Sequence, residues 1–326
     1  SPSRPLRAMP RRSWPSLRLL VVGALMLATG CGEEPSEPES LLTCELLAFV
    51  PRGSSMPFPS VRCDCPEDLL VDRFEVTRGL WLEIASRSDS LPDLDGRVGQ
   101  DWTEPTSLLL PAVGMDHAEA STFAALRGMR LPTVGEWMYV AGGSRAQTWP
   151  HGNSPETSVA NTAGVRLRAA APVGTFPNGQ STGTHVHDLI GNVWEWTTPP
   201  LPRGMVPASW LGVGGEDPHP LWAMGGSYLH PARALHGEGG VGAVRYFNAQ
   251  GLQHAHRAAD LGLRCVAPAR AFLVAHAREW SAPSLRPRVL AVGRLWGSRS
   301  VALLEVLAGR EGAPAALDWL LQGARQ

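Results

Sequence analysis

The stretch Asp188-Leu189-Ile190-Gly191-Asn192-Val193-Trp194-Glu195-Trp196 places two tryptophans and two carboxylates within nine residues. It lies in a longer segment, residues 142–263, that is rich in Gly, Pro, Asn and Trp and has only short apolar runs. Such a composition is typical of irregular structure built around small sheets. We therefore predict an α+β fold with little regular secondary structure, and neither a helical bundle nor a doubly wound sheet.

Upstream of this segment the sequence predicts one short strand and several helices. Apolar residues at residues 69–76 predict the strand, and residues 79–85 a helix. Asp116 precedes apolar residues at helical spacing, which predicts a helix over residues 116–127 with Asp116 as its N-cap. Thr133 and Glu136 have the spacing of a capping box, so residues 134–141 are expected to form another helix.

Residues 269–326 are expected to form a small helical C-terminal extension. Apolar residues recur near helical spacing in three places, residues 289–296, 301–307 and 314–321. Short helices are not stable alone in water and must bury their apolar face. We expect them to dock on the main domain, with docking on a partner protein as the alternative. The extension shows no catalytic motif.

Residues 1–30 have the features of a bacterial lipoprotein signal peptide. Arg11 and Arg12 precede an apolar run at residues 19–28, and small residues then lead directly to Cys31. The run is too short for a membrane-spanning helix, which needs about 20 residues. We expect Cys31 to be acylated and to anchor the protein to a membrane. A signal peptide without lipidation and a buried core helix are the alternatives.

After Cys31 we expect a lipid-anchored polar tether over residues 31–43, followed by the main domain over residues 44–268. The tether is rich in Pro and Glu. These features predict a protein of the bacterial cell envelope that faces the periplasm or the cell exterior. The chain has no lysine and a formal net charge of −1, and it shows no basic patch, which argues against nucleic acid as a partner.

Four cysteines remain after the predicted anchor: Cys44, Cys63, Cys65 and Cys265. An even number of cysteines in an exported chain favours disulfides. We expect one cysteine of the Cys63-x-Cys65 pair to bond Cys44 and the other to bond Cys265. A metal half-site at Cys63 and Cys65 is the alternative.

Several motifs occur in a fixed order along the chain. They are Arg130–Thr133, Glu136-Trp137, Trp149–Asn153, Pro172–Asn178, Asp188–Trp196, Gly225–Ser227 and Gly262–Cys265. This ordered series resembles the formylglycine-generating enzyme family, also called sulfatase-modifying factors, over roughly residues 69–268. The resemblance implies a compact α+β fold that is related to C-type lectins.

The resemblance also implies where an active site would lie, and there this chain departs from the family. Family oxidases bind copper through two cysteines shortly after the Gly-Gly-Ser turn, and His230 and Leu235 occupy those positions here. Without the two thiolates that suit Cu(I), we do not expect copper or formylglycine synthesis. Ser227 and Trp194 match family residues that line the cleft.

A calcium site is a further implication of the resemblance. The matching ligands are the carboxylates of Asp188 and Glu195 and the carbonyl groups of Gly191 and Val193. Such hard oxygen donors suit calcium. As the alternative, the two carboxylates accept hydrogen bonds from a loop. A second family ion site, at Asn161, lacks its expected Asp.

These expectations lead to two functions of different classes. The first is a non-catalytic envelope lipoprotein whose domain binds an envelope protein or a glycan or peptide ligand. The second is an oxidoreductase with a rebuilt copper or iron site formed by His230, His236, His254 and His256. Solvent-exposed or hydrogen-bonded histidines are the alternative to such a site.

Overall fold

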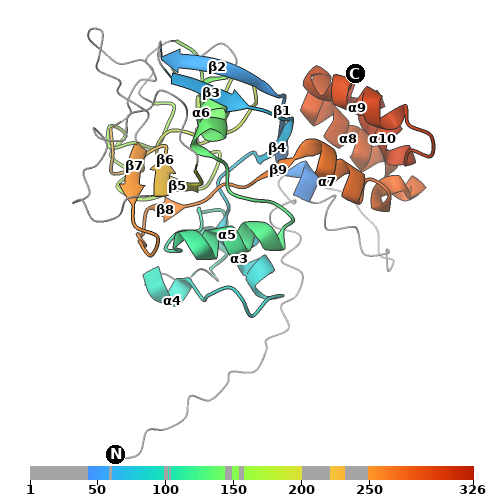
Figure 1. The fold of residues 1–326 in the computed structure, drawn as a ribbon. Coiled ribbons are helices and arrows are strands. Elements are labelled where there is room, and N and C mark those ends of the chain that lie inside the picture. The colour runs from blue at the N-terminus through green and yellow to red at the C-terminus, as the bar shows by residue number, and fades with distance from the viewer. Residues whose placement is uncertain are drawn as a thin grey trace, which may run out of the picture. The chain divides into compact units, whose positions relative to one another are not determined.

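Small sheets and short helices make up the computed structural model (Figure 1). It describes residues 43–326 except 59–60, 99–101, 103, 144–148, 154–157, 200–220 and 232–248. The predicted signal peptide, tether and lipidation site at Cys31 lie outside the described residues, as do Leu235 and His236. In the part that is described, no helix is both long and apolar enough to cross a membrane.

A central three-stranded antiparallel sheet joins the two ends of the main domain in the order β1-β4-β9. Its strands are β1 (Leu47–Val50), β4 (Leu69–Asp72) and β9 (Val266–Pro268). In this sheet Leu47 pairs with Asp72, and Val71 pairs with Val266. Residues of β1 and β4 are buried on both faces, which explains their uninterrupted apolar sequence.

Two further sheets carry the remaining strands. A four-stranded sheet has the order β7-β6-β5-β8, and only its β5–β8 pair is parallel. Its strands are β5 (Trp194–Thr197), β6 (Leu221–Met224), β7 (Ala249–Leu252) and β8 (Leu261–Gly262). The third sheet is the hairpin of β2 (Gly53–Phe58) and β3 (Val61–Cys65).

The described helices are short. Those of the main domain are α3 (Arg78–Ala85), α4 (Asp95–Val98), α5 (His117–Leu126) and α6 (Val134–Gly142), and those of the C-terminal part are α7 (Ala269–His276), α8 (Arg286–Trp296), α9 (Val301–Ala308) and α10 (Ala315–Ala324). Short 3-10 helices include η1 (Pro105–Ser107), η2 (Pro177–Gly179), η4 (Glu279–Ser281), η5 (Pro283–Leu285) and η6 (Gly297–Ser300).

Both capping predictions are confirmed. The Asp116 carboxylate accepts a hydrogen bond from Glu119 N at 2.9 Å, and the Glu119 carboxylate accepts one from Asp116 N. Thr133 and Glu136 make the same reciprocal pair at the start of α6. The predicted strand over residues 69–76 is shorter than expected, because β4 ends at Asp72 and the following residues turn toward other segments.

The central sheet divides the core into two clusters. Leu47, Phe49 and Leu70 face a cluster that includes α3, α5 and the C-terminal helices. Their neighbours Ala48 and Val50 face the other cluster, around α6 and β3. Successive side chains of a strand point to opposite faces of the sheet, so adjacent apolar residues pack into different clusters.

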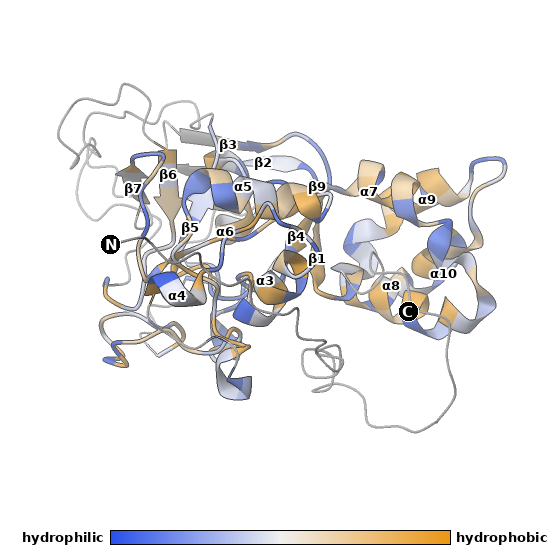
Figure 2. Cartoon of the chain, turned by 90° about the horizontal axis from the view of Figure 1, so that it is seen from below, coloured by the Kyte–Doolittle hydropathy of each residue, from blue (hydrophilic) through white to orange (hydrophobic). Residues whose placement is uncertain are grey.

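The C-terminal extension docks on the main domain, as predicted. Trp296 of α8 is fully buried and its Nε1 donates to the carbonyl oxygen of Leu47 at 3.1 Å. Arg288 forms a bidentate ion pair with Glu45 at 2.7–2.8 Å. The three helices α8, α9 and α10 lie together, and α9 is almost entirely apolar (Figures 1 and 2). Their apolar residues belong to the same core cluster as β1.

The predicted disulfides are not formed. Cys44, Cys63, Cys65 and Cys265 are all free and buried. Cys63 and Cys65 lie two residues apart on β3, so both side chains enter the α6 cluster, whereas Cys44 and Cys265 belong to the other cluster. Cys63 Sγ is 3.9 Å from Met138 Sδ, and Cys65 Sγ is 3.2 Å from the carbonyl oxygen of Glu67. The central sheet therefore separates the expected partners.

We predict that Gly323→Ala destabilises the extension by about 1–3 kcal/mol. A Cβ at Gly323 of α10 would overlap the carbonyl oxygen of Leu290 in α8, so the two helices must move apart. Gly96→Ala is the matched control, because a Cβ there meets no atom within 4 Å. Urea unfolding curves measure both effects, and equal stability of the two variants would contradict a close contact between these helices.

Candidate functional site

Ser227 lies at the position where the family cleft is expected, directly after two glycines with positive φ (97° and 81°). Its side chain is fully buried. Ser227 Oγ donates to Asp260 Oδ2 at 2.6 Å and accepts from Leu229 N at 3.2 Å. The hydroxyl hydrogen is therefore directed at a carboxylate, and the oxygen holds the following turn.

His230 completes this group. Its Nδ1 lies 2.9 Å from Ser227 Oγ. Because the single hydroxyl hydrogen of Ser227 goes to Asp260, Nδ1 must be the donor in this contact, which leaves the lone pair on Nε2. The imidazole also packs edge to face with Trp194 at a centroid distance of 4.9 Å. The structure thus brings together three sequence-predicted cleft residues, Ser227, His230 and Trp194.

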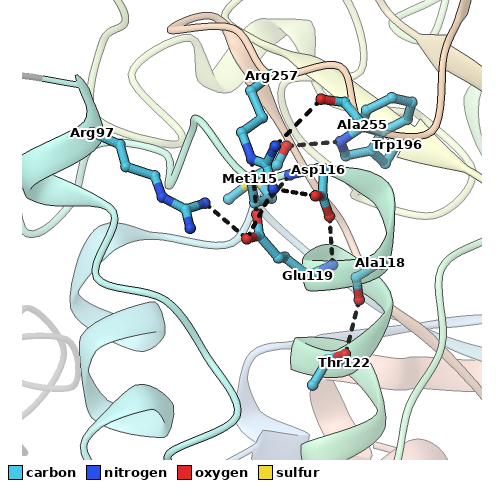
Figure 3. Close-up of polar contacts among 9 residues, drawn as sticks. All are labelled: Arg97, Met115, Asp116, Ala118, Glu119, Thr122, Trp196, Ala255 and Arg257. Carbon is cyan, nitrogen blue, oxygen red and sulfur yellow. Dashed lines mark hydrogen bonds and ion pairs between the residues drawn. The ribbon is translucent and has the colours of Figure 1, made fainter.

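Asp260 was not predicted from the sequence, because it has no motif of its own. Its carbonyl oxygen accepts from Trp194 N at 2.8 Å, so the residue is fixed through both backbone and side chain. The preceding loop is tied to the N-terminus of α5 by Arg257, whose guanidinium contacts both Asp116 and Glu119 (Figure 3). Arg97 of α4 donates to the same Glu119 carboxylate at 2.8 Å.

The charges around Glu119 explain its titration. Burial opposes ionisation of this carboxyl, but hydrogen bonds from Arg257, Asp116 N and Arg97 outweigh it and lower the pKa of Glu119 below its ordinary value. Glu119 therefore remains a carboxylate at neutral pH and holds α4, α5 and the loop before Asp260 together.

The histidines do not gather in the described structure. His254 and His256 are exposed on the loop before Asp260, whereas His230 packs against Trp194. His236 lies outside the described residues. Among the residues that are described, no three His, Cys, Asp or Glu side chains are grouped so that they could hold a metal ion.

A second group of polar residues lies in the domain interior and is centred on Glu195 and Arg264. Both side chains are 1% exposed and form an ion pair at 2.6 Å. Arg264 also donates to the carbonyl oxygens of Asp72 and His187, each at 2.8 Å. Trp137 Nε1 donates to Glu195 Oε2 at 2.7 Å, so both Glu195 oxygens are engaged.

Glu75 and Asp188 add two more carboxyl groups to this interior. Glu75 accepts from Asn192 Nδ2 at 2.6 Å and from Val193 N at 3.1 Å. Burial, followed by the charges of Asp188 and Glu195, raises the pKa of Glu75 well above its ordinary value. This role was not predicted, although an acid within an otherwise apolar strand pattern is a signal for one.

Asp188 is held in the left-handed region (φ 57°) and accepts from Gly174 N at 2.7 Å. Burial raises the pKa of Asp188 to about 6, and the charge of Glu195 adds to this effect, while Gly174 N and Arg264 oppose it. Asn161 belongs to the same polar network, because its amide nitrogen donates to Asn192 Oδ1 at 3.0 Å and to the carbonyl of Ala169.

These residues offer the oxygen donors that a hard divalent cation prefers, but Glu75, Asp188 and Glu195 are not grouped so that the three could hold one together. Glu75, Asp188 and Glu195 interact with one another and with one guanidinium, that of Arg264. Asp188, with the carbonyl groups of Gly191 and Val193, would supply oxygen ligands. Glu195 differs from the expected ligand set, because Arg264 and Trp137 already bind its oxygens.

We predict that Asp188→Asn raises the free energy of unfolding of the chelator-treated protein relative to wild type. This gain should be about 1–3 kcal/mol larger at pH 7 to 8 than at pH 4. The raised pKa of Asp188 means that this carboxyl favours the folded state below its unfolded pKa and loses that contribution as the pH rises through about 6. Asn keeps the shape of the side chain, tolerates positive φ and does not ionise.

Urea unfolding of both proteins across this pH range measures the difference. A stability difference that is independent of pH would contradict the raised pKa. Asp318→Asn, which removes an exposed carboxyl group of α10, is the control variant.

Comparison with known proteins identifies relatives of this chain. The inactive C-alpha-formylglycine-generating enzyme 2 of Mus musculus is 37% identical over 115 residues, which cover 29% of this chain and 37% of that protein. Hercynine oxygenase of Mycobacterium tuberculosis is 41% identical over 97 residues, covering 28% and 22%. The chain thus spans well under half the length of these relatives.

Among solved structures, PvdO from Pseudomonas aeruginosa is 19% identical with a TM-score of 0.48, and the match covers 68% of this chain and 93% of that chain. Residues 43–269 match the sulfatase-modifying factor enzyme 1-like domain, which is more than half of the chain. The chain therefore belongs to the sulfatase-modifying factor enzyme 1-like domain family.

Proposed function

We propose that this protein is a non-catalytic lipoprotein of the bacterial cell envelope, whose family domain serves as a binding or structural module. The observation that carries the proposal is the state of the cleft. Ser227 Oγ is bonded to Asp260, and His230 stands where the resemblance to family oxidases implies the first copper-binding cysteine. Leu235, at the second position, has no group that can ligate a metal.

Physical chemistry supports the loss of the oxidase reaction. Two thiolates suit Cu(I), and an imidazole with an alkyl side chain does not reproduce that soft, charged ligand pair. The four other cysteines are no substitute, since all are buried and burial raises the pKa of Cys63 and Cys65 to about 12, which disfavours their thiolates. A relative whose name describes it as inactive is consistent with a family that retains the fold without the activity.

The proposed anchor is the acylated Cys31, and the proposed partner is an envelope protein or a glycan or peptide ligand. Calcium at Asp188 is part of the proposal, since it would neutralise the interior carboxyl groups. In this proposal the domain acts as a scaffold that holds loops rigidly for recognition at a membrane surface.

One observation favours a second candidate, an oxidoreductase with a rebuilt copper or iron site. The Nδ1 of His230 contacts a serine that is itself bonded to a carboxylate, and such support is typical of metal-binding histidines. Further ligands would have to come from outside the described residues, because those described offer no suitable group. One of the relatives is named an oxygenase.

Metal content separates the two candidates. We predict that the full chain, purified from an oxidising compartment without chelator, contains about one calcium and no stoichiometric copper or iron. His230→Ala should leave the metal content unchanged, as should the control His276→Ala on α7. Stoichiometric copper or iron that is lost only in His230→Ala would establish the oxidoreductase instead.

We predict that Cys31→Ser moves the protein from the membrane fraction to the soluble fraction, because acylation of the thiol supplies the buried methylenes that hold it. Incorporation of a labelled fatty acid should disappear in the same variant. Ser36→Ala, in the predicted tether, is the control and should remain in the membrane fraction. Equal fractionation of wild type and Cys31→Ser would refute the proposed anchor.

A further inference from the structure

Two half-buried arginines, Arg73 and Arg299, each contact one loop, residues 183–187. Arg73 follows β4, and its carbonyl oxygen accepts from His187 N at 2.8 Å. Arg299 belongs to η6 of the C-terminal extension and donates through Nη1 to the carbonyl oxygen of Gly183. The loop therefore bridges the main domain, through the backbone carbonyl of Arg73, and the extension, through the guanidinium of Arg299.

Neither guanidinium has an acidic partner among the described residues. Arg73 Nη2 reaches only the carbonyl oxygen of Leu47, at 3.4 Å, and Arg299 Nε only that of Trp296, at 3.4 Å. The other buried arginines of the domain differ, since Arg127 pairs with Asp72 and Arg264 with Glu195. Partly buried charges are costly unless they are paired.

The two arginines are also close enough to repel each other. Burial, followed by the positive charge of Arg299, lowers the pKa of Arg73 below its ordinary value. Arg264, whose charge also acts on His187 of the loop, is already neutralised by Glu195. Neither Arg73 nor Arg299 is thus neutralised by an ion pair among the described residues, although Glu67 and Asp68 line one cavity with Arg299.

Arg73 and the loop carry three buried polar atoms that have no hydrogen-bond partner among the described residues: Arg73 Nε, Thr184 Oγ1 and His187 Nδ1. Thr184 is only 4% exposed. Buried donors are normally satisfied, and an unsatisfied group points to a missing water or ion. All three can donate a hydrogen bond, His187 in its Nδ1-protonated tautomer, so each is suited to an acceptor oxygen.

We propose that Arg73, Arg299 and the 183–187 loop bind a doubly charged oxyanion, a phosphate or sulfate group, where the extension joins the domain. Two guanidinium groups match two negative charges, and phosphate carries about −1.5 to −2 at neutral pH with three strong acceptor oxygens. Arginine is well suited to such groups because its donors form a fixed fork. The bound group would link η6 to the main domain.

Thermal unfolding of the full chain tests the site, with inorganic phosphate as the probe. We expect the Tm to rise with phosphate concentration and not with chloride at the same ionic strength, because a ligand of the native state stabilises it. In Arg299→Gln the apparent affinity for phosphate should fall about tenfold or more. Arg310→Gln, which removes an exposed arginine after α9, is the matched control and should respond as wild type does.

Thr184→Val is a second variant, which keeps the side-chain size and removes one orphaned donor. It should weaken phosphate binding even if Arg299→Gln fails to fold. The proposal would be overturned if phosphate raised the Tm no more than chloride does, or if it raised the Tm of Thr184→Val and Arg310→Gln equally. Water would then be the partner of the unsatisfied donors.

Glycerol 3-phosphate identifies the source of the bound group. Binding as tight as that of inorganic phosphate indicates a phosphate ester such as a lipid headgroup, and binding of inorganic phosphate alone indicates the free ion.

Discussion

The ion pair between Arg264 and Glu195 connects the segments on which the cleft depends. Arg264 follows β8, Glu195 lies on β5, and the same guanidinium binds the backbone at the end of β4 and just before Asp188. With both side chains 1% exposed, each charge would be buried without compensation if the other were absent. Trp137 of α6 adds a hydrogen bond to the same carboxylate.

This interior fixes the backbone that presents the cleft residues. Glu75 binds Val193 N and the side chain of Asn192, and the next residue along the chain is Trp194, which packs on His230. The contacts that hold the scaffold thus lie outside the two positions that we propose to have lost their copper-binding cysteines. Under that proposal the architecture is kept while the chemistry differs.

Local signals predicted the elements that depend on neighbouring residues. Capping boxes placed α5 and α6, and helical spacing placed α8, α9 and α10, because these interactions span only three or four residues. The ordered motifs predicted the family and placed Ser227, His230 and Trp194 together. Asp260, Glu75 and Arg299 were not predicted as site residues, since their partners lie 33 to 118 residues away and no local pattern encodes such contacts.

The cysteines show the same limit. Their number predicted disulfides, but the central sheet separates Cys63 and Cys65 from Cys44 and Cys265. The strand order β1-β4-β9, which causes this separation, cannot be inferred from the cysteine spacing.

We conclude that the buried pair Arg264–Glu195 supports the domain as a unit. A double-mutant cycle of Arg264→Met and Glu195→Gln, followed by urea unfolding, tests this most directly. We expect each single variant to lose about 3–5 kcal/mol, and the double variant to lose clearly less than the sum, because neither member of this pair is then left as a buried charge without the other. Additive losses, or single losses below about 1 kcal/mol as at a surface ion pair, would contradict the conclusion.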